Sequence, residues 1–177
     1  MSEKSKPINL QPKSIQISDV SVLFDKARAL FRKEKYQEAI PYYEKVLEIE
    51  PQNVEAMLHK GVALGNLGNR DEAIPCFDAV LDLNSKNPDA IFYKGHALYK
   101  LGKYSESIIW YEKNLEIDSC DTAALKAKAA SLCSLGKDEQ ARACYEKVVE
   151  INPKDSEALF LRNAIINKEG SKGAMYG

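Results

Sequence analysis

The fold of this 177-residue chain is decided by residues 53–85, which read NVEAMLHKGVALGNLGNRDEAIPCFDAVLDLNS. The first half places Met57, Gly61 and Leu64 at positions i, i+4 and i+7, which is one face of an amphipathic helix. Gly68 then interrupts the pattern where a glycine with positive φ is expected to end a helix. The second half carries a second apolar face, formed by Ala73, Ile74, Phe77, Val80 and Leu81. The stretch therefore predicts two helices joined as a hairpin.

The same pattern recurs along the chain at one constant spacing. The positions that keep step are Leu30, Leu64, Leu98 and Leu132; Ala39, Ala73, Ser107 and Ala141; Tyr43, Phe77, Tyr111 and Tyr145; and Ile49, Leu83, Ile117 and Ile151. A period of this size indicates stacked supersecondary units, each of which buries its apolar face against its neighbours. We therefore predict an all-α fold, an α-solenoid of four helical hairpins.

Each predicted hairpin sets a small residue against a large one. The first helices carry the small residues Ala27, Gly61, Gly95 and Ala129, and the second helices carry the aromatic column that contains Phe77. A small residue lets two helix backbones approach closely, so we expect each aromatic ring to fill the space beside it.

These features resemble the tetratricopeptide repeat, whose period is about 34 residues. The resemblance rests on that constant period, the small residues, the Ala-x-x-x-aromatic pattern of the second helices and the prolines Pro51 and Pro153 at the ends of the first and fourth units. The lysine column and the Glu-Ala-Ile and Leu-Gly-Lys runs are similar to prokaryotic, and especially archaeal, members. The first unit departs from the pattern because Glu34 replaces the hairpin glycine, so we expect its turn to differ in length.

The resemblance covers one domain, predicted at residues 18–169. It implies repeats at about 20–53, 54–87, 88–121 and 122–155, followed by a single capping helix at about 156–168, as solenoids need at their ends. Residues 1–17 and 170–177 are predicted to be flexible tails, because they lack periodicity. Ile8, Leu10, Ile15 and Ile17 leave open whether the first tail lies in a groove.

In this family the first helices line a concave face that binds peptides. Carried over position by position, the resemblance predicts groove residues at Phe24, Arg28, Phe31, Leu58, Val62, Asn66, Phe92, His96, Tyr99 and Lys126. The aromatic members are expected to stand near one another, and an exposed apolar patch of this kind often marks a partner site. Packing between helices is the alternative interpretation of the same residues.

The chaperone-binding branch of the family clamps a C-terminal carboxylate with lysines and asparagines at set groove positions. The corresponding positions here hold Phe24, Arg28, His59, Asp89 and Tyr93. Asp89 would repel a carboxylate. We therefore predict apolar and aromatic peptide contacts, not this clamp.

Composition and motifs exclude several other functions. The formal net charge of −1 gives no general attraction to nucleic acid or anionic membrane, and no apolar run is long enough to span a membrane. The beginning of the chain lacks the apolar core of a secretory signal, and its four cysteines are predicted to be free thiols in a cytoplasmic protein. We find no catalytic, metal-binding or cofactor-binding motif, so the sequence predicts no enzyme, no metal and no cofactor.

One further pattern needs an interpretation. The lysine column of Lys26, Lys60, Lys94 and Lys128 resembles a phosphate-binding stripe, but acidic neighbours in sequence favour a solvated surface instead.

Three functional hypotheses remain. The first is a non-enzymatic adaptor that binds a peptide or a partner segment in the groove. The second is a structural scaffold that self-associates through the solenoid ends or tails. The third is an accessory domain of a larger enzyme complex, for which a partner chain would supply the catalytic groups.

Overall fold

The chain forms a stack of helical hairpins. The computed structural model describes residues 17–173, with side-chain surroundings for residues 20–168, and this part contains helices and no strand. The helices are α1 (Ile17–Arg32), α2 (Tyr36–Ile49), α3 (Val54–Asn66), α4 (Arg70–Leu83), α5 (Pro88–Lys100), α6 (Tyr104–Ile117), α7 (Thr122–Ser134), α8 (Asp138–Ile151) and α9 (Ser156–Gly173). The predicted tail residues 1–16 and 174–177, with Ile8, Leu10 and Ile15, lie outside the described residues.

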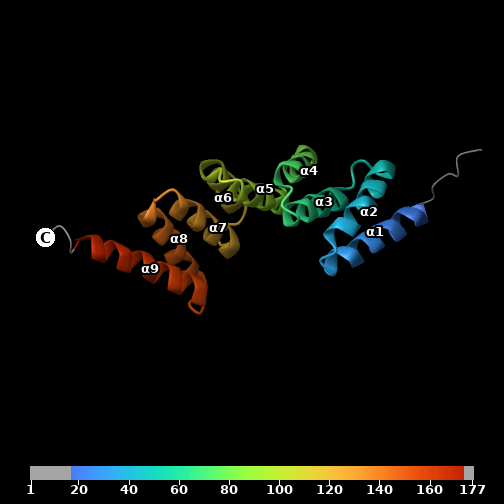
Figure 1. Cartoon of the computed structure of the whole chain (residues 1–177). Coiled ribbons are helices and arrows are strands. Elements are labelled where there is room, and N and C mark those ends of the chain that lie inside the picture. The colour runs from blue at the N-terminus through green and yellow to red at the C-terminus, as the bar shows by residue number, and fades with distance from the viewer. Residues whose placement is uncertain (1–16, 174–177) are drawn as a thin grey trace, which may run out of the picture.

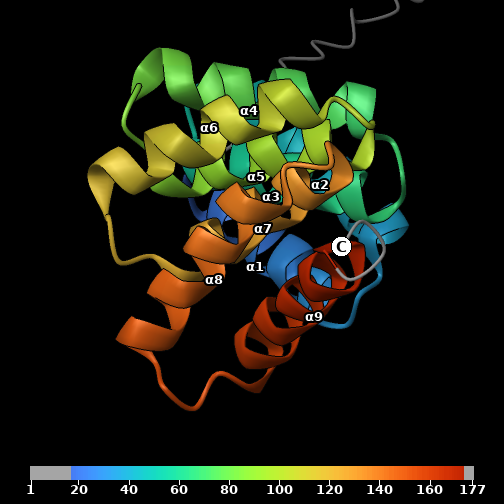
Figure 2. The same cartoon turned by 90° about the vertical axis from the view of Figure 1, so that its left-hand side faces the viewer.

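The hairpins follow one another along an extended, curved stack from α1 to α9 (Figures 1 and 2). Each helix packs against the next one in sequence, and the first helices of successive hairpins also contact one another, α1 with α3, α3 with α5 and α5 with α7. These contacts confirm the predicted α-solenoid of four hairpins closed by a single C-terminal helix. The first helices therefore form one continuous surface along the stack.

Recurring polar residues begin the first helices. The side chains of Asn53, Asn87, Asp121 and Asp155 accept a hydrogen bond from the backbone N–H three residues later, at 2.9 to 3.1 Å. Such N-caps satisfy one of the four N–H groups that the first turn of a helix leaves without an internal partner. Because the caps recur with the same period as the apolar columns, each hairpin starts at the same register.

The turn inside each hairpin needs a left-handed residue. Gly68, Gly102 and Gly136 have φ between 71° and 91°, and Glu34 takes the same conformation with φ of 58°. The N–H of the following residue donates to a carbonyl five residues back in all four turns, at 2.9 to 3.0 Å, so the expectation of a different turn length at Glu34 is wrong. The helix-ending hydrogen bonds impose the turn, and Glu34 accepts a strained φ that glycine would adopt freely.

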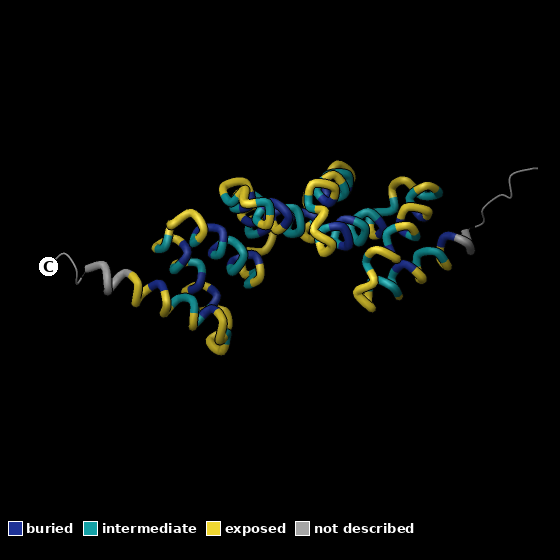
Figure 3. The backbone as a smooth tube through the Cα atoms, in the orientation of Figure 1, coloured by how far each residue is buried: buried dark blue, intermediate teal, exposed yellow. Residues whose placement is uncertain are grey.

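The predicted contact of small and aromatic residues is confirmed. A Cβ added to Gly61 would lie 2.7 Å from Cε1 of Phe77, and one added to Gly95 would lie 3.0 Å from Cε1 of Tyr111. Figure 3 shows the buried residues running along the inside of each hairpin. The helices can therefore approach this closely only because these positions lack a side chain.

The C-terminal helix is longer than predicted. Helix α9 continues to Gly173, past the expected end at about residue 168 and into the predicted tail 170–177. Near this end the Lys168 amine forms an ion pair with Asp138 of α8 at 2.6 Å. The contact ties the helix to the stack, and no proline follows to stop it.

Candidate functional site

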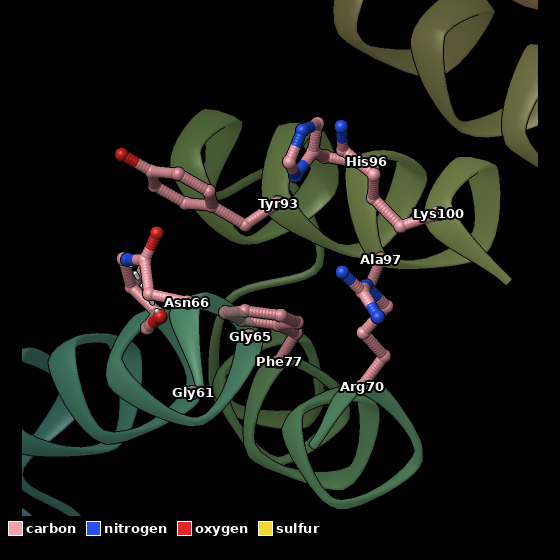
Figure 4. Close-up of a pocket in the computed structure, with 10 residues that line it drawn as sticks. Gly61, Gly65, Asn66, Arg70, Phe77, Tyr93, His96, Ala97 and Lys100 are labelled. Atoms are coloured by element: carbon pink, nitrogen blue, oxygen red, sulfur yellow. Dashed lines mark hydrogen bonds between the residues drawn. The ribbon is translucent and has the colours of Figure 1, made fainter. Parts of the chain in front are cut away.

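A cavity of about 300 Å³ opens between α3 and α5, near the middle of the stack (Figure 4). It is lined by Gly61, Val62, Gly65, Asn66, Arg70, Phe77, Tyr93, His96, Ala97 and Lys100. The rings of Phe77 and Tyr93 stack with their centroids 6.0 Å apart and their planes at 20°. The cavity thus combines an aromatic wall with a polar rim.

Two residues explain why this space is open. A Cβ added to Gly65 would meet no heavy atom within 4 Å. The equivalent positions one period before and after are Phe31 and Tyr99, whose rings lie 5.2 Å from Tyr36 and 5.5 Å from Tyr104. In the second hairpin the pair is Gly65 with Arg70, so no pair of rings fills the space.

The rim of the cavity is cationic. Arg70 reaches toward α5, while His96 and Lys100 project from α5 itself (Figure 4). Partial desolvation, followed by the positive charges of Lys100 and Arg70, lowers the pKa of His96, so its imidazole is neutral at physiological pH. No carboxylate is among the residues that line the cavity.

The predicted groove residues lie in four places: the cavity, a set on α1, a set on α5, and the isolated position of Lys126. Val62, Asn66 and His96 line the cavity, and the Asn66 side-chain amide donates a hydrogen bond to the carbonyl of Val62 at 3.0 Å. Leu58 is half-buried and packs against the apolar cluster of the second hairpin. Beside the cavity, Phe92 lies with its ring 5.7 Å from the ring of Tyr93.

The predicted aromatic residues do not form one patch. The ring of Phe24 lies 6.0 Å from that of Tyr43, and the ring of Phe31 lies 5.1 Å from that of His59, at the junction of the first hairpin with α3. Arg28 is held beside them by an ion pair with Glu55 at 3.8 Å.

Phe92 and Tyr99 form a second set on α5. Phe92 contacts Tyr111, and Tyr99 contacts Tyr104. The expectation of a single aromatic group is therefore corrected to two sets, on the first and third hairpins, because each ring packs against the second helix of its own hairpin.

Lys126 lies apart from both sets. Its amine contacts Glu157 at 2.7 Å and Asp155 at 3.3 Å. The hydrogen bond to Glu157, more than that to Asp155, raises the pKa of Lys126. This predicted groove cation is therefore already paired within the chain.

Three lysines of the column are paired as well, whereas Lys26 is exposed and lies over the ring of Tyr42. Lys60 bonds Glu44 at 2.9 Å, Lys128 bonds Glu112 at 2.8 Å, and Lys94 contacts the carboxylate of Asp78. Each acid lies at the same offset before its lysine, on the second helix of the preceding hairpin. The interpretation as a solvated surface is wrong for these three half-buried lysines, which bridge neighbouring hairpins.

Other ligand sites gain no support from the described residues. In this part of the chain no group of three or more His, Cys, Asp or Glu side chains is placed to hold a metal ion. Within the same limits, no helix is both long and apolar enough to cross a membrane. Cys76, Cys120, Cys133 and Cys144 are free thiols.

Sequence reasoning missed Arg70, which lies on a second helix. The family resemblance predicts groove residues on the first helices alone, whereas the start of α4 also reaches the cavity. A comparison along the repeat could have found it, because the column of Tyr36, Arg70, Tyr104 and Asp138 changes from aromatic to charged.

The geometry defines a helical-repeat protein with an extended first-helix surface, of the kind that such proteins use for binding. The model of the family described as anaphase-promoting complex, cyclosome, subunit 3 matches residues 32–114 and again residues 66–148. The two matches begin one repeat period apart, so they read the same repeat in two registers. The chain is a tetratricopeptide repeat protein, a class whose fold generally serves protein interaction.

Solved structures share the fold. MamA 41-end from Desulfovibrio magneticus RS-1 has a TM-score of 0.80 and 22% identity, covering 88% of this chain and 89% of its own. YrrB, described as a TPR protein with an unusual peptide-binding site, has a TM-score of 0.72 and 21% identity, covering 89% and 82%. The first TPR of Spaghetti (RPAP3), bound to the HSP90 peptide SRMEEVD, has a TM-score of 0.64 and 25% identity, covering 67% and 94%. Curated protein sequences contain no match.

Proposed function

We propose that this chain is a non-enzymatic adaptor that binds an extended segment of a partner protein along the surface of its first helices. The observation that carries the proposal is the open cavity between α3 and α5, to which Val62, Asn66 and His96 contribute. The half-buried side chains of Leu58 and Phe92 lie on the same two helices. Binding sites typically combine a mainly apolar lining, as Leu58 and Phe92 would provide here, with a small number of polar groups.

Two similar structures support a peptide as the ligand. The Spaghetti repeat holds a bound peptide, and YrrB is described by its peptide-binding site. The four free thiols suit a reducing compartment, so we place the adaptor in the cytoplasm. The two aromatic sets, on the first and third hairpins, would anchor a segment that crosses the cavity between them.

The test is selection of binding peptides from a random display library with the wild-type chain. Peptides that use the groove are expected to bind at least about tenfold more weakly to Phe92→Ala/Tyr99→Ala, because aromatic anchors dominate such interfaces. Asn66→Tyr provides a second variant, since Asn66 is exposed and the new ring would block the cavity without removing core packing. Thermal unfolding checks that both variants are folded.

The matched control is Ile109→Ala on the second helix α6, where the side chain is 52% exposed. It should bind every selected peptide as the wild type does. Selected peptides that bind equally well to Asn66→Tyr and to the double alanine variant would contradict the groove.

Self-association is a second candidate, favoured by apolar side chains at the two ends of the stack. Val22 on α1 is 65% exposed and Phe160 on α9 is 72% exposed. Val22 shares its repeat position with Ala56, Ala90, Ala124 and Ala158, all of which are fully buried against a preceding hairpin. Light scattering tests this, and a monomer at every concentration would dismiss it.

A further inference from the structure

The second and fourth hairpins both leave a cavity, but the charged side chains that line the two cavities differ. In the fourth hairpin the cavity, of about 200 Å³, includes Cys133, Asp138 and Lys168. Asp138 and Lys168 form an ion pair at 2.6 Å. Two periods earlier the same two positions hold Arg70 and Lys100. Where one cavity contains an acid and a base, the other contains two bases.

The two bases lack an acid of their own. Among the described residues, neither Arg70 nor Lys100 forms an ion pair, whereas the lysines that bridge neighbouring hairpins do. The Nε of Arg70 is buried without a hydrogen-bond partner, and its Nη1 makes only a long contact of 3.4 Å with the Gly68 carbonyl. A buried guanidinium N–H without an acceptor costs free energy that an added acceptor would recover.

The remaining groups at the cavity suit the same ligand. His96 and Asn66 offer neutral donors at the rim, and the stacked rings of Phe77 and Tyr93 form a wall for an aliphatic stem. Desolvation and, to a smaller extent, the charge of Asp89 raise the pKa of Tyr93. The charge of Asp89 does not contribute to the shift in the pKa of His96. The cationic end of the cavity therefore faces no competing carboxylate within its lining.

We infer that the cavity between α3 and α5 is a subsite for a carboxylate, bound by the guanidinium of Arg70 and the amine of Lys100. The inference rests on the proposed function, because the carboxylate would belong to the partner segment in the same groove. The subsite is distinct from the clamp positions of the chaperone-binding branch, of which it contains only Tyr93. Arginine suits it because its planar fork binds both oxygens of a carboxylate.

Three small probes test the chemistry by NMR titration. N-acetylglutamate N-methylamide carries a side-chain carboxylate, N-acetylglutamine N-methylamide is its neutral isostere, and N-acetylalanine presents a main-chain carboxylate. Either acid is expected to shift the His96 and Tyr93 signals, while the glutamine probe should bind at least tenfold more weakly. The stronger of the two acids identifies the source as an acidic side chain or a free C-terminus.

Arg70→Gln is expected to weaken the acidic probe roughly tenfold, since it removes a charge-assisted hydrogen bond. Gly65→Phe/Arg70→Tyr transplants the ring pair of the first hairpin, and it should abolish probe binding while keeping the fold. Lys126→Gln is the matched control, because this cation is already paired outside the cavity. It should leave the affinity unchanged.

The fourth hairpin offers the reverse experiment. Asp138→Arg would place a second base beside Lys168 and is expected to create a carboxylate site there, seen as new shifts of Tyr145.

Equal binding of the glutamate and glutamine probes, or unchanged binding by Arg70→Gln, would overturn the carboxylate subsite. The proposed function fails separately, when selected peptides ignore Phe92→Ala/Tyr99→Ala and Asn66→Tyr. If the selected peptides need the groove but are not enriched in acidic residues, the proposed adaptor function stands and the carboxylate subsite is wrong.

Discussion

The first and third hairpins are closed by ring pairs, whereas the second and fourth are open. Phe31 packs against Tyr36 and Tyr99 packs against Tyr104, with ring centroids 5.2 and 5.5 Å apart. Gly65 with Arg70, and Cys133 with Asp138, leave cavities at the same positions. All four hairpins have the same turn hydrogen bonds. The difference therefore teaches that one set of columns specifies the stack and another set decides where a cavity is left.

The largest expected effect comes from removing the ring pair of a closed hairpin. Phe31→Gly/Tyr36→Arg gives the first hairpin the pair of the second, and should lower the free energy of unfolding by about 3 kcal/mol. The ring of Phe31 loses its contacts with Tyr36, Tyr43 and His59, which lie at 5.1 to 6.4 Å. Urea unfolding measures the loss. An unchanged stability would mean that the ring pairs do not support the stack.

A smaller difference in the free energy of unfolding is expected between substitutions at two glycines of α3. Gly61→Val should cost about 2 kcal/mol, because even its Cβ would lie 2.7 Å from the ring of Phe77. Gly65→Val is the matched control four residues later, where the Cβ meets open space and the cost should be near zero. The same denaturation experiment compares them. Equal losses would contradict the difference between a structural glycine and an open one.

The next effect is stabilising and concerns the turn of a closed hairpin. Glu34→Gly should raise the free energy of unfolding by about 0.5 to 1 kcal/mol, because glycine adopts the left-handed φ of 58° without strain. Thermal unfolding gives the shift in Tm. Gly102→Glu at the equivalent turn is the control and should lower the Tm by a similar amount.

The sequence was sufficient for the fold because the columns that decide it are repeated. Gly61, Tyr43 and the cap Asn53 each belong to a column that recurs four times, so chance agreement is small. The turn at Glu34 escaped prediction because helix-ending backbone hydrogen bonds outweighed the side chain's preference against a positive φ. The length of α9 escaped it because the contact of Lys168 with α8 lies beyond what local sequence shows.

The proposed site could be predicted only in part, because the positions that set its cavity apart are those at which the repeat columns differ. A substitution such as Arg70 for tyrosine looks like ordinary variation until the structure places it beside Lys100. The split of the predicted aromatic group had a related cause. The spacing put Phe31 and Phe92 on equivalent helices, but it could not show that each ring turns toward its own hairpin.

The smallest expected effect is the pH dependence that His96, in the open second hairpin, gives to the free energy of unfolding. The pKa of His96 is lowered, so the folded chain disfavours the protonated ring relative to the unfolded chain, whose histidine pKa is about 6.5. The free energy of unfolding is therefore at its full value above that pH and decreases as the pH falls through the folded pKa. Urea unfolding of wild type and His96→Gln measures this, and the decrease should be smaller in the variant.

NMR titration of the imidazole gives the sharper version of this experiment. Arg70→Gln should move the pKa of His96 upward, toward its ordinary value, because one of the two nearby positive charges is removed. Lys126→Gln, which removes a charge outside the cavity, should not. A His96 titration that is the same in both variants would place the guanidinium away from the imidazole. The open hairpin would then differ from the closed ones in volume alone, and not in the charge that it offers to a ligand.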